Sequence, residues 1–143
     1  MQHPESSPQP PCSTPDFAFF YEGLANGQLL IQQCRDCGTL RNPPMPLCAI
    51  CASFAWVARP MAGTGTLFSY TIHHHPPLIG FPSPHPVGLV ELTEGIRFVA
   101  AMDGVPLARI AIGMPLELEF LRRGGVPSLR FRMAGGAPAE PAR

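Results

Sequence analysis

The sequence contains no lysine and little charge of either sign, although it has 143 residues. Its 10 basic residues are all arginines, and 10 acidic residues balance them, so the formal net charge is zero at pH 7. Proteins that bind nucleic acids normally carry clustered cationic side chains that replace the counterions around phosphates. The charge balance therefore argues against nucleic acid as a partner.

The sequence also lacks a long apolar run, since no stretch approaches the roughly 18 residues that a membrane-spanning helix needs. Its first residues, MQHPESSPQPP, contain neither the basic segment nor the apolar segment of a secretory signal. We therefore expect a soluble, cytoplasmic protein that has no membrane partner.

Proline and glycine are abundant, with 19 and 14 residues, and this composition disfavours long helices. Residues 1–13 and 134–143 are rich in proline, glycine and polar residues, so we expect two disordered tails that add nothing to the core. Cys12 lies in the first tail, where we expect a free thiol without a role.

One short helix is expected directly after the first tail. Thr14 is a suitable N-cap, Pro15 suits the first helical position, and Gly27 suits the position just beyond the helix end. Four apolar residues at helical spacing give this helix an aromatic face that must pack against another element. These residues are Phe17, Phe20, Tyr21 and Leu24.

The rest of the chain favours β-strands. Two strands are expected at 29–33 and 54–59, and five more are expected at 64–75, 86–93, 96–102, 115–122 and 128–133. A single helical turn fits residues 105–113, where a five-stranded barrel of the oligonucleotide/oligosaccharide-binding (OB) type carries an insertion. The last five strands therefore predict a small OB-fold barrel.

Four of the five cysteines form two C-x-x-C pairs that are separated by ten residues. Such pairs turn four sulfurs toward one point, which is the tetrahedral shell that zinc prefers. The four thiolates close the shell, so no position remains for a catalytic water. We therefore predict one structural zinc ion bound by Cys34, Cys37, Cys48 and Cys51.

Three alternatives to zinc remain for these cysteines. Iron can occupy the same cage of four thiolates. Disulfides are disfavoured by the expected cytoplasmic location, and a redox-active pair is usually a lone C-x-x-C beside a βαβ unit.

The residue after the second cysteine pair is unusual. Gly38 follows the first pair, whereas Ala52 follows the second. A positive φ at Ala52 would cost about 1 kcal/mol.

The order of motifs along residues 16–133 is distinctive. An aromatic helix ending in Asn26-Gly27 precedes CRDCG, the segment Arg41-Asn42-Pro43-Pro44 and the second cysteine pair. The segment GTGTLFSYT from Gly63, the segment IGMPL from Ile112 and the terminal RFR from Arg130 follow. In this order the chain resembles the DUF35 family, whose members combine a rubredoxin-like zinc ribbon with an OB fold.

This resemblance implies a function and a domain organisation. Family members are accessory subunits of thiolase-like enzymes, including aldolases and acyltransferases of steroid, aromatic or polyketide metabolism, or of MaoC-type hydratases. The expected fold is mainly β, with the helix and zinc ribbon at 14–60 and the five-stranded OB-fold barrel at 61–133. The sequence offers no nucleophile–base pair, paired acidic site or dinucleotide fingerprint, so we expect catalysis to reside in the partner.

Four arginines flank the expected last turn and are candidate contacts for the phosphates of coenzyme A, because guanidinium groups match phosphate oxygens. A solvated surface is the alternative, since no glycine-rich phosphate loop accompanies them. These residues are Arg122, Arg123, Arg130 and Arg132.

The proline-rich loop 76–86 carries the apolar residues Leu78, Ile79 and Phe81. They either dock into a partner or cover one end of the barrel. Three histidines precede this loop and a fourth lies near its end. Solvated strand ends are a better interpretation of them than a metal or catalytic site, because alternation separates neighbouring side chains. They are His73, His74, His75 and His85.

Two other functions remain open on sequence grounds. A zinc ribbon and an OB fold also occur in nucleic-acid-binding proteins, although aromatic stacking platforms beside basic charge are scarce here. A free-standing acyl-CoA-binding protein or weak thioesterase is the third alternative, and direct binding of acyl-CoA by the isolated chain would favour it.

Overall fold

The computed structural model describes residues 14–136 of the chain. Residues 1–13, with Cys12, and residues 137–143 lie outside the described residues, so the expected disorder of both tails stays a prediction there. Residues 134–136 continue from the last strand into a turn. There Gly136 donates its N–H to the carbonyl of Met133 and accepts from Arg132.

The predicted helix is present but starts differently. A 3₁₀ turn at Pro15–Phe17 leads into α1, Ala18–Ala25. Thr14 occupies the N-cap position of the 3₁₀ turn and Pro15 its first position, as expected. The Thr14 side chain makes no capping hydrogen bond, and its backbone carbonyl accepts from Phe17. The predicted end is confirmed, because Gly27 has a φ of 69° and continues the chain in the left-handed conformation that favours glycine.

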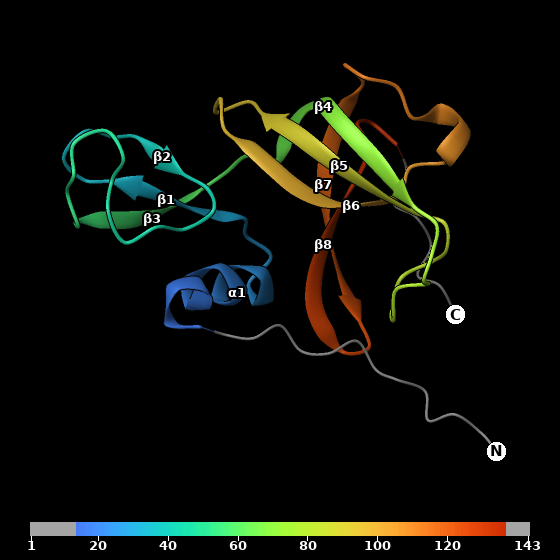
Figure 1. The fold of residues 1–143 in the computed structure, drawn as a ribbon, viewed down its shortest axis with the longest axis horizontal. Helices are drawn as coiled ribbons and strands as arrows, with labels where there is room; N and C mark the ends of the chain where they lie inside the picture. The colour runs from blue at the N-terminus through green and yellow to red at the C-terminus, as the bar shows by residue number, and fades with distance from the viewer. Residues whose placement is uncertain (1–13, 137–143) are drawn as a thin grey trace.

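The ribbon is a three-stranded antiparallel sheet with the order β2-β1-β3. It consists of β1 (Leu30–Cys34), β2 (Leu40–Arg41) and β3 (Trp56–Pro60). Strands β1 and β3 match the two strands expected beside the cysteine pairs, whereas β2 was not expected. Figure 1 shows this sheet on one side of the molecule, with α1 below it and the barrel on the other side.

The remaining strands form a closed barrel with the order β4-β5-β6-β8-β7, which confirms the predicted OB-type architecture. Strands β6 and β8 run parallel, while the other barrel neighbours are antiparallel. The predicted helical turn is the 3₁₀ helix η2, Leu107–Arg109. The strands are β4 (Thr64–His73), β5 (His85–Leu92), β6 (Arg97–Gly104), β7 (Pro115–Arg123) and β8 (Val126–Met133).

The helix, the ribbon and the barrel share contacts. Leu24 of α1 belongs to the buried core, and the ring of Phe20 lies 6.0 Å from that of Phe98 in β6, as the predicted aromatic face requires. On the ribbon side, Asn42 Nδ2 donates to the carbonyl of Arg97 at 2.9 Å. Figure 1 shows α1 below the ribbon and beside strand β8. None of the helices among residues 14–136 has the length and apolar character to cross a membrane.

Candidate functional site

The four predicted metal ligands meet at one end of the ribbon. Their sulfur atoms all lie within 4.8 Å of one another. The Sγ atoms of Cys34 and Cys51 are 3.5 Å apart, and those of Cys37 and Cys48 are 3.6 Å apart. A tetrahedron with Zn–S bonds of about 2.3 Å has sulfur–sulfur edges of about 3.8 Å, so the four thiols fit a single four-coordinate zinc ion.

The two cysteine pairs use the same backbone turn. Gly38 donates its N–H to the carbonyl of Cys34 at 3.0 Å, and Ala52 donates its N–H to the carbonyl of Cys48 at 2.9 Å. Both donors have a positive φ, 75° at Gly38 and 61° at Ala52. The anticipated left-handed conformation of Ala52 is therefore confirmed, and the second turn carries strain that the first turn avoids.

The groups around the sulfurs favour the thiolate form at Cys37 and disfavour it at Cys51. The Thr39 hydroxyl lies 3.1 Å from Cys37 Sγ and, as a hydrogen-bond donor, lowers the pKa of Cys37 to about 6. At Cys51 the backbone N–H of Ser53 acts in the same direction. The Cys34 thiol, burial and the two other cysteines together outweigh it and raise the pKa of Cys51 to about 12. Four thiolates near neutral pH therefore need a bound cation, which zinc supplies.

Three of the four candidate arginines are paired with carboxylates. Arg123 donates to Asp103 at 2.7 Å, and Arg130 contacts both Asp103 at 3.4 Å and Glu119 at 2.7 Å. Arg132 forms the corresponding pair with Glu117 across β7 and β8, and the remaining arginine, Arg122, is exposed and donates to the carbonyl of Gly125. The structure thus does not bring the four guanidinium groups together as a free cationic surface.

The sequence carried a signal for these ion pairs that the initial interpretation missed. Glu117 and Glu119 are two residues apart on one strand, and Arg130 and Arg132 are two residues apart on the next. The members of each pair therefore lie on the same face of their strand. In an antiparallel hairpin such residues lie opposite each other, and the register pairs Glu119 with Arg130 and Glu117 with Arg132.

The apolar loop divides into exposed and packed residues. Leu78 and Ile79 are 40% and 58% exposed. Phe81 instead packs against His85, with ring centroids 4.5 Å apart, and the guanidinium carbon of Arg123 lies 4.6 Å from the Phe81 centroid. Leu78 and Ile79 are therefore available to a partner, whereas Phe81 attaches the loop to the barrel.

The histidines do not assemble a site. His73 contacts the carbonyl of Pro76 through Nε2 at 2.6 Å, and His74 and His75 are exposed. His85 is buried, and burial lowers the pKa of its imidazole. Within residues 14–136, the cysteine cluster is the one group of histidine, cysteine and acidic side chains arranged to hold a metal ion.

A second exposed apolar feature lies beside the metal site. Ile50, inside the second cysteine pair, and Phe54, just after it, are 73% and 74% exposed. The sequence interpretation missed them, although two large apolar residues in a short proline- and cysteine-rich segment are poor candidates for a core.

These observations define the class of the molecule: a zinc ribbon with a four-cysteine metal site, joined to an OB-fold barrel. The ChsH2 zinc-ribbon model, described as a rubredoxin-like zinc ribbon domain, matches residues 22–57, and the ChsH2 C-terminal OB-fold domain model matches residues 58–121. The chain belongs to the DUF35 family, in its ChsH2-type branch.

A solved structure, which aligns with this chain over almost the whole of its own length, supports the assignment to the DUF35 family. It is a chain of the "Ltp2-ChsH2(DUF35) aldolase", with 43% sequence identity and a TM-score of 0.81. The match covers 87% of this chain and 98% of that one.

Curated relatives include subunits of several acyl-CoA enzymes. A probable enoyl-CoA hydratase alpha subunit of Thermomonospora curvata is 44% identical over 84% of this chain, and the 3-oxo-4,17-pregnadiene-20-carboxyl-CoA hydratase alpha subunit of Mycobacterium tuberculosis is 39% identical over 78%. The match spans 38% and 35% of those two longer proteins. The benzoylsuccinyl-CoA thiolase subunit BbsA of Thauera aromatica is 28% identical, and the match covers 92% of this chain and 95% of BbsA.

Proposed function

We propose that this chain is a non-catalytic accessory subunit of an acyl-CoA-processing enzyme complex, with one structural zinc ion in its ribbon. Its partner is a thiolase-like enzyme, either an aldolase or an acyltransferase, or a MaoC-type hydratase. The observation that carries this proposal is the match to the DUF35 chain of the Ltp2-ChsH2 aldolase, which covers 98% of that chain at 43% identity.

The variety of the relatives supports an accessory role. One fold occurs in proteins named as hydratase, thiolase and aldolase components, and these names describe three different reactions on or related to acyl-CoA compounds. A single active site in the ribbon or barrel does not explain three chemistries, whereas a shared binding role does.

The chemistry of the described residues agrees with that role. The four thiolates fill the zinc coordination shell, so a bound zinc ion has no open position for water or substrate. The carboxylates of Asp103 and Glu119 are neutralised by ion pairs with Arg123 and Arg130, so they are not free to act as catalytic acids or bases. We place the catalytic groups in the partner for this reason.

We further propose that Leu78 and Ile79 belong to the docking surface, because they are exposed apolar residues on a loop that Phe81 attaches to the barrel. Contact with acyl-CoA phosphates remains part of the proposal only for Arg122, which has no carboxylate partner among the described residues. The division into a helix–ribbon part at 14–60 and a barrel at 61–133 and the cytoplasmic location belong to the same proposal.

The test is affinity purification of the tagged full chain from its native host, followed by mass spectrometry and a chain-to-chain ratio. We expect a thiolase-like, aldolase or hydratase subunit in a fixed ratio. The double substitution Leu78→Ser/Ile79→Ser should lower recovery of that partner at least about tenfold, because two apolar contacts of roughly 1 kcal/mol or more are lost.

The matched control is Ile50→Ser/Phe54→Ser, which makes the same type of change at the exposed ribbon end. Loss of partner only in this control would move the docking surface to the ribbon. Recovery of single-stranded nucleic acid instead of an acyl-CoA enzyme, with binding that weakens steeply as salt is added, would overturn the proposed function.

A further inference from the structure

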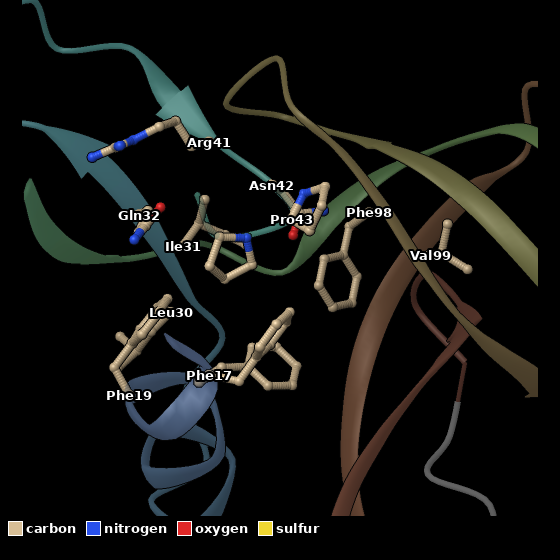
Figure 2. A pocket seen from close by; sticks show the side chains of 12 residues that line it. Phe17, Phe19, Leu30, Ile31, Gln32, Arg41, Asn42, Pro43, Phe98 and Val99 are labelled. Carbon is tan, nitrogen blue, oxygen red and sulfur yellow. The ribbon is translucent and has the colours of Figure 1, made fainter. Parts of the chain in front are cut away.

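Two cavities of about 310 Å³ each lie beside α1, and Phe20 and Phe98 line both of them. The first reaches the ribbon, and Figure 2 shows Phe98 on its barrel side and Gln32 on its ribbon side. The second lies against β6 and the start of β8, and the apolar loop, residues 76–84, contributes Phe81 to its lining. The Phe81 ring therefore has open space on one side.

Phe81 is the residue that attaches the apolar loop to the barrel. Of residues 76–84, Phe81 alone is not exposed. Its backbone N–H donates to the carbonyl of Leu78 at 3.2 Å, which is a bond within the loop itself. A segment with so few buried contacts opens at a low cost in free energy. Whether the loop is closed or open therefore depends on what holds the Phe81 ring.

His85, the first residue of β5, provides the surface against which Phe81 packs. The two ring centroids are 4.5 Å apart, and His85 is 4% exposed. Its Nδ1 atom is buried without a hydrogen-bond partner. An imidazolium donates from both ring nitrogens, so protonated His85 would bury a positive charge and a donor without an acceptor.

The charged and titratable groups around His85 come from three strands. His73 of β4 lies opposite His85 in the register, Asp103 of β6 attracts a positive charge on the imidazole, and Arg123 of β7 repels it. The Asp103 carboxylate is already paired with Arg123 at 2.7 Å and with Arg130 at 3.4 Å. Burial, Arg123 and His73 together outweigh the attraction of Asp103 and lower the pKa of His85 below its ordinary value of 6.5.

We propose that His85 is a pH-sensitive latch for the apolar loop. Its neutral ring packs against Phe81 and keeps the loop closed, and a proton taken up by His85 releases the loop. In the open form the imidazole is in water, where it binds a proton more readily, so acid favours the open form. An effect on docking through Leu78 and Ile79 rests on the proposed function, whereas the latch is a property of the isolated chain.

His73, the other histidine that contacts the loop, does not act in this way. Its Nε2 lies 2.6 Å from the carbonyl oxygen of Pro76. A carbonyl oxygen only accepts, so Nε2 carries the proton in this bond. The imidazolium keeps that proton, so protonation of His73 leaves the bond in place. Acid therefore acts on the loop through the contact between Phe81 and His85.

The experiment measures hydrogen exchange of the Phe81 amide by NMR in the full-length, zinc-loaded chain, between about pH 7.5 and about pH 5.5. Each rate, divided by the intrinsic rate at the same pH, gives the opening constant of the loop. Carbon shifts of the His85 ring report its charge. We expect His85 to titrate below 6.5. The opening constant should rise at least about threefold over this range, and no more steeply than the roughly tenfold per pH unit that one proton allows.

Substitutions assign the response to His85. His85→Phe keeps an aromatic ring beside Phe81 but cannot take up a proton, so it should abolish the rise. His75→Phe makes the same change at an exposed histidine and should keep the rise. His73→Gln retains a donor for the carbonyl of Pro76 and should also keep it. Zinc content and thermal midpoint verify that each variant is folded.

An opening constant that stays the same over this pH range in the unmodified chain would overturn the latch, and this comparison needs no variant. The same rise in His85→Phe would also overturn it. Association with the co-purified partner should weaken over the same pH range in the unmodified chain but not in His85→Phe. If the loop opens as expected while association is unaffected, the latch is supported and the docking role of Leu78 and Ile79 is rejected.

Discussion

The backbone strain at Ala52 gives the sharpest quantitative prediction for the metal centre. Ala52 follows the second cysteine pair with a φ of 61°, a conformation that costs an L-residue about 1–2 kcal/mol. Replacing it by glycine removes this cost but raises the entropy of the unfolded chain, and that entropy lowers the stability by about 0.4–1 kcal/mol. We therefore expect Ala52→Gly to stabilise the zinc-bound ribbon by about 0.5–1 kcal/mol.

Because the ribbon folds together with its metal, this gain should appear as tighter zinc binding. A change of about 0.5–1 kcal/mol corresponds to a zinc affinity that is about two- to fivefold higher. Competition with a chromophoric chelator at fixed pH measures the affinity, and denaturant unfolding of the zinc-bound protein measures the stability.

The first cysteine pair provides the matched control. Gly38 occupies the equivalent position with a φ of 75°, and a Cβ built on it would contact nothing within 4 Å. Gly38→Ala should therefore lower zinc affinity by a comparable factor through backbone strain alone. If Ala52→Gly lowered zinc affinity, or if both substitutions changed it in the same direction, the strain argument would be refuted.

Three further predictions concern folding. Cys48→Ser should abolish zinc binding and unfold the ribbon while the barrel persists, which metal analysis and backbone NMR spectra would reveal. Burial alone would raise the pKa of Asp103, but the hydrogen bond and charge of Arg123 and the charge of Arg130 keep it below its ordinary value of 3.8. The ion pairs should therefore stabilise the fold above that pH and lose their effect as pH falls through the lowered pKa. Asp103→Asn should cost about 3 kcal/mol at pH 7, measured by denaturant unfolding. His85 has a pKa lowered by burial, so the unfolded chain takes up its proton first and stability should fall as pH drops below about 6.5. His85→Phe should remove that part of the pH dependence in thermal melts.

Features encoded by neighbouring residues could be predicted from the sequence. The spacing of Cys34, Cys37, Cys48 and Cys51 defined the metal ligands, because two short turns fix the directions of the sulfurs. The barrel strands followed from alternation and turn residues. For example, 115–122 was expected for β7, which occupies Pro115–Arg123.

Features that depend on distant residues could not be predicted in this way. Strand β2 has two residues, which is too short for a periodic pattern, and it forms by pairing with β1. Arg123 pairs with Asp103 only because the barrel closes. The sequence does not indicate this ion pair, so Arg123 was predicted as a phosphate contact. Phe17, Arg41 and Phe98 lie far apart in the sequence, and only the fold brings them together around one cavity.

The central claim is that this chain assists catalysis without performing it. The most direct measurement compares acyl-CoA turnover by three samples: the isolated zinc-loaded chain, the co-purified partner enzyme alone, and the reconstituted complex. We predict no turnover by the isolated chain and higher or more stable turnover by the complex than by the partner alone. Robust turnover by the isolated chain would contradict the account, and so would a partner whose activity and stability are the same with and without it.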